Sequence, residues 1–207
     1  KQKWIGAMNG QQLFDVIIIG GSYAGLSAAM GLGRARRHVL IIDSGKPCNR
    51  QAPQAHNFIT HDGVPPAVIA QKAKAQVLAY PTVVFVDDKA LTAMGTDGHF
   101  EITTESGSSF RSKKLLLAYG VKDIPMPIPG FEQCWGISVL HCPYCHGYEV
   151  RDAALGVIAN GDMGFEYARL IANWSKNLAL FTNGPSTLNE EQQDKLRVKG
   201  IAVVEQA

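Results

Sequence analysis

The amino-acid sequence predicts an α/β fold with two similar halves, each built around a parallel sheet. A pattern of apolar strand, glycine turn, helix and second apolar strand occurs twice, starting near residues 14 and 155. Continuous apolar strands are typical of parallel sheets whose two faces are both buried. Between the two patterns, a proline-rich stretch over 125–129 is followed by Gly130, which predicts a stiff boundary. We therefore expect one domain over residues 11–121 and a second over 122–207.

The first half opens with a strand, a turn, a helix and a second strand. Residues 14–19 (FDVIII) and 38–42 (HVLII) are short, β-branched and apolar, so we expect both to be buried strands. The helix expected over 26–37 is rich in Ala, Leu and Met and ends in three arginines, which suit the negative end of a helix dipole. A strand, crossover helix and strand in this order predict a parallel pair.

The remainder of the first half contains one long loop and several strands. Residues 44–66 are rich in Pro, Gly, Asn and His, and a stretch of this length is typical of a functional or disordered loop. A helix is expected over 67–80. The strands expected after it, separated by glycine-containing turns, are 82–86, 99–104, 108–112 and 114–118.

The second half repeats this order of elements. Thr187 and Glu190 have the spacing of a capping box, which predicts a helix that runs to Lys199 and stops at Gly200. Both halves are therefore expected to have the fold of nucleotide-binding (Rossmann-like) domains. The remaining elements predicted for this half are a strand over 155–159, a turn over 160–164, a helix over 165–174, and strands over 177–181 and 201–204.

The composition excludes several classes of protein. The chain has 20 basic and 18 acidic residues among 207, a net charge of +2, which predicts no nucleic-acid partner. No apolar run approaches the roughly 18 residues of a membrane span, and the first ten residues do not have the pattern of a signal peptide. Four cysteines are too few for a disulfide scaffold, so we expect a cytoplasmic protein. Cys48 and Cys134 are predicted to be small buried residues.

The first glycine turn has the pattern Gly20-x-Ser22-x-x-Gly25 directly after a predicted strand. The dinucleotide fingerprint is G-x-G-x-x-G, with its middle glycine replaced here by a serine. Asp43 follows 18 residues after Gly25, at the end of the next strand, where a carboxylate binds ribose hydroxyls. The pattern predicts a dinucleotide site; the alternative is a tight turn with an ordinary strand-end aspartate.

The second motif is the run HCPYCHG over residues 141–147. Cys142 and Cys145 could carry a haem with His146 as iron ligand, but such a domain is secreted and mostly helical. With His141 and His146 they could bind zinc, although six consecutive residues would then have to surround one ion. As a redox pair, one thiolate attacks a disulfide and the other resolves the mixed disulfide, with His146 exchanging protons. We favour redox chemistry over zinc, and zinc over haem.

The second glycine turn is an imperfect fingerprint, A-x-G-x-x-G over residues 159–164. The next strand ends in Phe181-Thr182-Asn183-Gly184, which offers neither an acidic residue for a ribose nor an arginine pair for a 2′-phosphate. Nucleotide binding by this half is therefore left open.

Taken in order, these motifs resemble the low-molecular-weight thioredoxin reductase family. The resemblance rests on the glycine turn, on Asp43, on the Lys46–Gln51 loop, on Ala118-Tyr119-Gly120 and on the run CPYCHGYE over 142–149. It is closest to the branch with a C-P-[YF]-C-H-G-Y-E active site, which includes thioredoxin reductase-like flavoproteins and fungal dithiol oxidases related to gliotoxin oxidase. It covers residues 14 to 204.

The resemblance implies a homodimeric, FAD-dependent thiol/disulfide oxidoreductase whose pyridine-nucleotide-type domain carries the cysteine pair. Cys145 would face the flavin as the charge-transfer thiolate, and Cys142 would be the interchange thiol that meets the substrate. His146 stands where the family usually has an aspartate. The residues that the resemblance assigns to FAD are Gly20, Ser22, Tyr23, Ala24 and Gly25 at the pyrophosphate, Asp43 and Ser44 at the ribose, Arg50, Gln51 and Asn57 along the ribityl chain and flavin, Ala90 at the adenine, and Ala118, Tyr119 and Gly120 in place of the family's Ala-Thr-Gly.

Two departures from the family pattern leave the reaction open. The NADPH fingerprint and its phosphate-binding arginines are not matched, so two hypotheses stay open. One is an NADPH-dependent reductase that binds NADPH at Asn160, Gly161, Asp162 and Met163; the other is an oxygen-using dithiol oxidase that needs no NADPH. The family's C-terminal Gly-Asp segment is absent, so we expect an incomplete FAD domain that needs roughly a hundred further residues. The substrate would be a thioredoxin-like protein or a small dithiol or disulfide. The alternative from another class is a non-catalytic module that binds zinc or a nucleotide.

Overall fold

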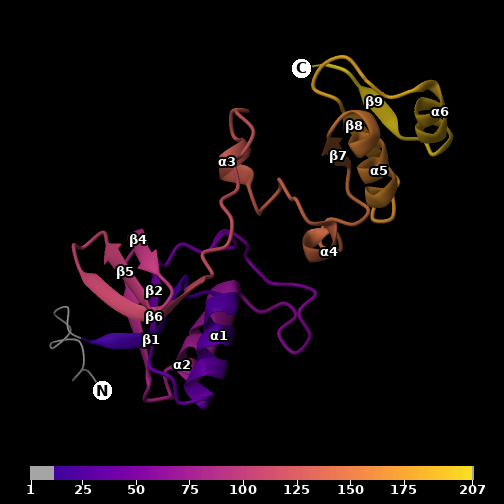
Figure 1. Ribbon diagram of the computed structural model, residues 1–207. Coiled ribbons are helices and arrows are strands. Elements are labelled where there is room, and N and C mark those ends of the chain that lie inside the picture. Colours follow the sequence, from indigo (N-terminus) through magenta and orange to yellow (C-terminus); the bar gives the residue numbers. More distant parts are fainter. Residues whose placement is uncertain (1–11, 207) are drawn as a thin grey trace. The chain divides into compact units, whose positions relative to one another are not determined.

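The computed structural model describes residues 12–206, which form two compact units. The first contains residues 12–55 and 63–137, and the second contains 56–62 and 138–206 (Figure 1). Residues 1–10, residue 11 of the first predicted domain and residue 207 of the second lie outside the described residues. Among the described residues, no helix is long and apolar enough to cross a membrane.

The first unit contains a six-stranded sheet in the order β3-β2-β1-β6-β5-β4. The first four strands of this order are parallel, and β5 and β4 complete the sheet as antiparallel strands. The strands are β1 (Leu13–Ile19), β2 (Val39–Asp43), β3 (Val83–Asp87), β4 (Ala90–Thr96), β5 (His99–Thr104) and β6 (Ser109–Leu117). The predicted parallel β–α–β unit is confirmed, with β1 and β2 in register from Val16–Val39 to Ile19–Ile42.

Both faces of β1 and β2 in this sheet are buried, as their continuous apolar sequences predicted. Ile17 and Ile18 are adjacent in β1, point to opposite faces and are both 0% exposed. Ile18 packs with residues of α1 (Tyr23–Arg34) and α2 (Pro66–Val77), such as Leu26 and Val77. Ile17 packs in a separate cluster with residues of β5 and β6. The sheet therefore supplies a rigid support for the turns at the ends of its strands.

Two strand predictions for this unit were wrong. The strands expected over 108–112 and 114–118 are one continuous strand, β6, whose residue Ser112 is fully buried. The polar run at 111–114 suggested a break, but β6 pairs with β1 on one side and β5 on the other. Strand β4 was not predicted, because its residues at the sheet edge are mostly exposed and have no regular alternation.

The second unit contains a three-stranded parallel sheet in the order β7-β8-β9. Its strands are β7 (Leu155–Ile158), β8 (Leu178–Phe181) and β9 (Ala202–Val204), and its helices are α4 (Pro143–His146), α5 (Gly161–Ile171) and α6 (Glu190–Val198). Phe165 and Ala168 of α5 pack with Leu180 of β8 and Leu196 of α6. A further short helix, α3 (Phe131–Cys134), belongs to the first unit.

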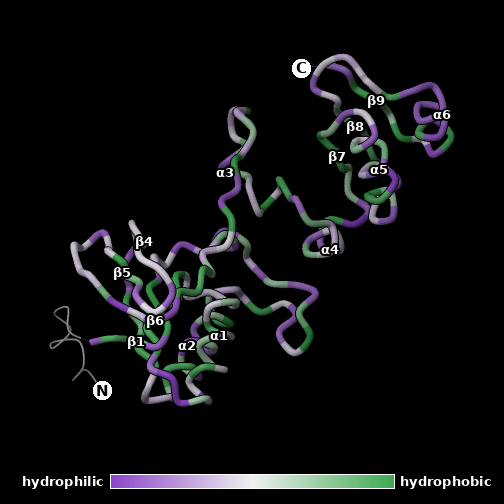
Figure 2. Tube along the Cα trace, viewed as in Figure 1, coloured by the Kyte–Doolittle hydropathy of each residue, from purple (hydrophilic) through white to green (hydrophobic). Residues whose placement is uncertain are grey.

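The helix boundaries differ from the predictions by one to four residues. Helices α1 and α2 begin and end earlier than expected, and α5 begins at Gly161 rather than 165. The capping box of α6 is formed by Asn189 and Gln192, and not by Thr187 and Glu190. Figure 2 shows α6 as a largely hydrophilic helix. Leu196 is its one buried residue. Asparagine accepts the capping hydrogen bonds as well as threonine does, so the pattern alone did not fix the start.

Candidate functional site: a glycine turn and a C-x-x-C disulfide

The first glycine turn lies where the carboxyl ends of β1, β2 and β6 meet. Gly20 has φ +102°, and a side chain there would overlap the backbone of Ala118. A side chain at Gly25 would overlap the carbonyl oxygen of Gly20. The amide of Ala118 donates to Ile19 O at 2.7 Å, which ties the end of β6 to this turn. This edge is where ligands bind in open α/β sheets.

The helix that follows this turn has an open N-terminus. Ser22 is the N-cap of α1 but makes no side-chain capping hydrogen bond, and the first turn carries no acidic residue. The first N–H groups of a helix have no partner within the helix, and the helix dipole makes this end positive. The turn therefore offers backbone donors for a pyrophosphate, together with the hydroxyl of Ser22.

Asp43 is positioned beside this turn by two backbone amides. Its Oδ1 accepts from the N–H of Gly21 at 2.9 Å, and its Oδ2 accepts from the N–H of Gly45 at 3.2 Å. A strand-end carboxylate in this position suits the two hydroxyls of a ribose. The residues present fit the adenosine diphosphate part of a dinucleotide such as FAD.

The other predicted cofactor residues lie in several segments. Ser44 follows Asp43, Ala90 begins β4, and Tyr119 and Gly120 follow β6. Arg50 donates to Pro47 O at 3.3 Å, and a side chain at Gly136 would contact Gln51. Tyr23 and Ala24 are the first residues of α1. Asn57 lies in the loop 56–62, which belongs to the second unit.

The cysteine pair of the second unit forms a disulfide within one helical turn. Cys142 is the N-cap residue of α4 and Cys145 lies within it, with their Cα atoms 5.3 Å apart. The amides of Cys145 and His146 both donate to the carbonyl of Cys142 at 3.2 Å. Within residues 12–206, there is no group of three or more His, Cys, Asp or Glu side chains that could hold a metal ion.

Gly147 and Trp174 fix the position of the short helix that carries the disulfide. The amide of Gly147 donates to Pro143 O at 2.7 Å, and a side chain at Gly147 would overlap Trp174. The ring of Tyr144 meets that of Trp174 edge to face, at 5.6 Å between centroids. Of the other cysteines, Cys134 is half-buried but Cys48 is exposed, so the prediction that Cys48 is buried was wrong.

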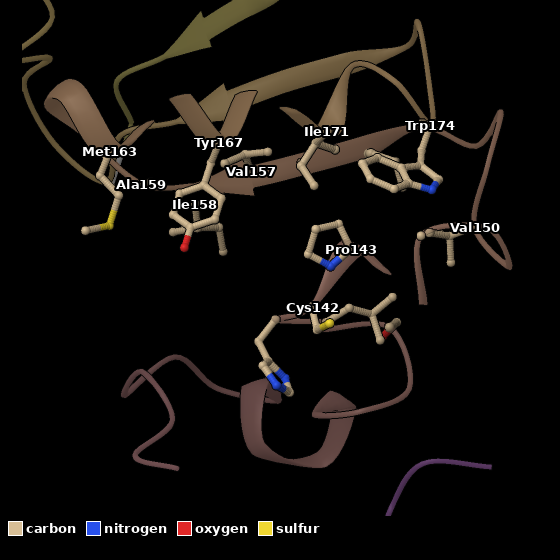
Figure 3. A pocket seen from close by; sticks show the side chains of 17 residues that line it. Cys142, Pro143, Val150, Val157, Ile158, Ala159, Met163, Tyr167, Ile171 and Trp174 are labelled. Atoms are coloured by element: carbon tan, nitrogen blue, oxygen red, sulfur yellow. The ribbon is translucent and has the colours of Figure 1, made fainter. Parts of the chain in front are cut away.

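A pocket of about 370 Å³ lies beside the disulfide within the second unit (Figure 3). Cys142 is one of its lining residues, whereas Cys145 is not. None of the 17 lining residues is Asp, Glu, Lys or Arg. Its walls are mostly apolar and come from α4 and the segments on either side of it, from β7, from α5 and from the segment after α5. Pro143, Val157, Met163, Tyr167 and Trp174 are among the lining residues.

The polar surroundings of the disulfide contain three histidines and a glutamate. Burial lowers the pKa of His146; the charge of Glu149 acts in the opposite direction, and His141 and His56 lower this pKa further. His56 Nε2 lies 3.5 Å from Glu149 Oε1, and His56 Nδ1 lies 3.6 Å from Asp62 Oδ1. Sequence reasoning missed His56, because no local pattern links it to a motif some 90 residues away.

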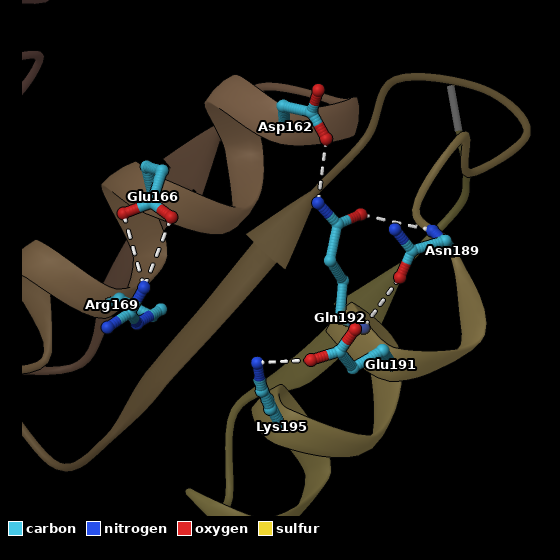
Figure 4. Close-up of polar contacts among 7 residues, drawn as sticks. All are labelled: Asp162, Glu166, Arg169, Asn189, Glu191, Gln192 and Lys195. Atoms are coloured by element: carbon cyan, nitrogen blue, oxygen red, sulfur yellow. Dashed lines mark hydrogen bonds and ion pairs between the residues drawn. The ribbon is translucent and has the colours of Figure 1, made fainter.

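The second glycine turn makes hydrogen bonds to the segment before α6 and to α6 itself. Asn160 Oδ1 accepts from the amides of Gly161 and Thr187 at 2.8 and 2.9 Å, and Asn160 Nδ2 donates to Pro185 O at 2.9 Å. Asp162 lies in the first turn of α5 and accepts from Gln192 Nε2 at 2.7 Å (Figure 4). Met163, the last residue predicted for NADPH, lines the pocket instead. These contacts satisfy the amide of Gly161 and place the carboxylate of Asp162 at the helix end that a pyrophosphate would need.

An open dinucleotide turn and a C-x-x-C disulfide in one α/β chain are a combination typical of nucleotide-dependent disulfide oxidoreductases. Comparison with known proteins agrees with this class: the model of the pyridine nucleotide-disulphide oxidoreductase family matches residues 14–207. The chain belongs to this family, within its thioredoxin reductase-like members.

Named relatives support the same assignment. The chain is 37% identical over 194 residues to thioredoxin reductase aclD of Aspergillus oryzae, and 34% identical over 192 residues to thioredoxin reductase tcpT of Claviceps purpurea. Each match covers 89% of this chain and 60% of the relative. The crystal structure of the oxidoreductase from Agrobacterium tumefaciens is 41% identical, with a TM-score of 0.89 over 93% of this chain and 65% of that one.

These matches confirm the predicted family and the predicted α/β, Rossmann-like fold. The thioredoxin reductase family uses FAD, and the turn at Gly20 and Asp43 fits the adenosine diphosphate part of this cofactor. The chain spans about 60% of the length of the curated relatives that it matches.

Proposed function

We propose that this chain is part of an FAD-dependent thiol/disulfide oxidoreductase of the thioredoxin reductase type. The observation that carries the proposal is the Cys142–Cys145 disulfide, beside His146, in the same chain as the open turn at Gly20. Bound FAD would accept or deliver two electrons at a time. We assign the residues 11–121 to the FAD-binding domain and 122–207 to the pyridine-nucleotide-type domain.

We assign Cys142 as the thiol that exchanges with substrate and Cys145 as the thiol that resolves the mixed disulfide. Cys142 lines the pocket and Cys145 does not, which supports this division. In the reductive direction, the Cys142 thiolate attacks a substrate disulfide, forms a mixed disulfide and releases one substrate thiol. The Cys145 thiolate then attacks the Cys142 sulfur, which restores the protein disulfide and releases the second thiol. Oxidation of a substrate dithiol is the reverse.

The pocket favours a small disulfide or dithiol over a thioredoxin-like protein as the substrate. Its volume of about 370 Å³ is within the range of small-molecule sites, and the absence of Asp, Glu, Lys and Arg from its lining favours an uncharged compound. We also propose a cytoplasmic homodimer with no nucleic-acid or membrane partner.

A dithiol oxidase that uses oxygen and not NADPH is the second candidate, and the closed turn at Asn160 favours it. The net reaction would convert a substrate dithiol and O₂ into a disulfide and H₂O₂. A pyridine nucleotide would have to displace the hydrogen bonds that Asn160 makes to residues 161, 185 and 187. Anaerobic addition of NADPH to the full-length protein separates the two: bleaching of the flavin supports a reductase, and bleaching by a dithiol alone supports the oxidase.

The test of the main proposal is the absorption spectrum and turnover of the full-length protein and four cysteine variants. We expect visible flavin bands in the wild type, and loss of disulfide turnover in Cys142→Ser and Cys145→Ser. The matched controls Cys48→Ser and Cys134→Ser change free cysteines and should retain turnover. A protein without flavin, or a Cys145→Ser variant with full turnover, would disprove the proposal.

A further inference from the structure

The disulfide has a polar neighbourhood that the proposed thiol exchange does not explain. The imidazole of His56, with 18% of its side chain exposed, lies between the carboxylates of Asp62 and Glu149. The two nitrogen–oxygen distances are 3.6 and 3.5 Å, so each ring nitrogen of His56 lies close to one carboxylate oxygen. Glu149 is only three residues after His146 and four after Cys145. A partly buried His–carboxylate pair therefore adjoins the redox helix.

The loop that carries His56 is fixed by its own hydrogen bonds. The amide of Asn57 donates to Asp62 Oδ1 at 2.8 Å, and the amide of His61 donates to Phe58 O at 2.9 Å. The Thr60 hydroxyl and His61 Nδ1 are 2.9 Å apart. Because these bonds hold Asp62 beside His56, the imidazole has a defined position from which to pair with Glu149.

Glu149 has the opposite electrostatic effect on His146 from the other neighbours. Burial lowers the pKa of His146, and the nearby imidazoles of His141 and His56 act in the same direction. The carboxylate of Glu149 raises it, because a negative charge stabilises the imidazolium. Among the groups that face His146 in the described part of the chain, Glu149 is thus the one that favours its protonated form.

We propose that Glu149 is a positioning residue that stabilises the protonated ring of His146 when the disulfide is reduced, and that His56 holds the Glu149 carboxylate in place. This inference rests on the redox role proposed above. When two electrons arrive from a reduced flavin or a reducing dithiol, the S–S bond breaks and two protons are taken up. One proton forms the Cys142 thiol and the other stays on His146, so that Cys145 remains a thiolate.

The test is the pH dependence of Cys145 alkylation in the reduced full-length protein. The protein is reduced, freed of reductant and treated with iodoacetamide, and the labelled cysteine peptides are followed by mass spectrometry. Glu149→Gln should move the midpoint of Cys145 labelling upward by roughly one pH unit. The direction follows because loss of the carboxylate lowers the pKa of His146, so the imidazolium is lost at lower pH and the thiolate needs higher pH to form.

Three controls separate this effect from general damage. Glu166→Gln removes another surface carboxylate of the second unit, one that pairs with Arg169 at 3.1 Å, and should leave the midpoint unchanged. Glu149→Asp keeps the charge and should restore most of the wild-type profile. Exposed Cys48 provides an internal reference in every sample. An unchanged midpoint in Glu149→Gln would overturn the role of Glu149.

The role of His56 is tested by the sign of a second shift. If His56 anchors Glu149, His56→Leu should move the midpoint upward, but by less than Glu149→Gln does. If His56 acts only as a positive charge that repels the proton of His146, His56→Leu should move the midpoint of Cys145 labelling downward. A downward shift, or no shift, would overturn the anchoring role. Alkylation needs no flavin, so these outcomes are independent of the flavin content and turnover that test the proposed function.

Discussion

The two glycine turns of this chain follow equivalent strands, β1 and β7, and each opens a helix, α1 or α5. In the first, Ser22 makes no capping hydrogen bond and the first turn of α1 contains no acidic residue. In the second, Asn160 caps α5, and Asp162 adds a negative charge to the same helix end. The first turn is thus free to bind an anion, whereas in the second the amide of Gly161 already donates to the Asn160 side chain and a carboxylate stands at the helix end.

The comparison teaches that strand–turn–helix topology alone does not make a nucleotide site. Both helices have positive N-terminal ends, and the difference lies in the residue just before each helix. The Ser22 hydroxyl makes no capping hydrogen bond, whereas the side-chain amide of Asn160 bonds to residues 161, 185 and 187. Changes in these few side chains should therefore separate cofactor binding from folding.

The largest effect is expected from adding a side chain to the open turn. Gly25→Val places a side chain against the carbonyl of Gly20, which must shift the turn that would face the pyrophosphate. We expect at least a tenfold loss of flavin from the purified full-length protein, equal to about 1.4 kcal/mol or more of binding free energy. Flavin per protein, measured by absorbance after denaturation, is the readout.

The matched control is a glycine in the same helix with open space around it. A side chain at Gly31 would meet no other atom within 4 Å, so Gly31→Ala should leave flavin binding unchanged. It should also stabilise α1 by roughly 0.5–1 kcal/mol, because alanine is a better helix former than glycine. Equal flavin content in both variants would show that the first turn does not bind the cofactor.

Local patterns account for the parts of the fold and site that could be predicted from sequence. The apolar runs of β1 and β2, the turn at Gly20 and the spacing of Cys142 and Cys145 all lie within short segments. The contacts that distinguish the two turns join segments far apart in the sequence, since Asn160 bonds to Thr187, 27 residues away. His56 reaches Glu149 across an even longer separation, and such pairings are determined by the folded chain and not by periodicity.

A smaller effect, on stability and not on cofactor binding, is expected when the caps are removed. Asn160→Ala deletes the acceptor and donor that bind residues 161, 185 and 187, and should destabilise the start of α5 by about 1–2 kcal/mol. Ser22→Ala removes no capping hydrogen bond and should leave the stability of α1 nearly unchanged.

Hydrogen–deuterium exchange of the two helices in the full-length protein measures both cap variants in the same way. We expect faster exchange at the start of α5 in Asn160→Ala, and wild-type exchange of α1 in Ser22→Ala. Equal changes in the two helices would contradict the distinction between an open and a closed turn. Weaker flavin binding by Ser22→Ala, with α1 unchanged, would locate the serine hydroxyl at the cofactor.

The smallest effect concerns the hydrogen bond that links α5 to α6. Gln192 accepts from the amide of Asn189 within the capping box and donates to Asp162 at 2.7 Å. Gln192→Glu keeps an acceptor for the cap but places a negative charge against Asp162, so we expect a loss of stability below about 1 kcal/mol that decreases as salt is added. Asp162→Asn in the same background removes the repulsion and should restore the wild-type unfolding midpoint in urea. Because a carboxylate pair is screened by salt whereas a lost cap is not, a loss that is independent of salt would show that the substitution acts through the capping box of α6 and not through the closed turn.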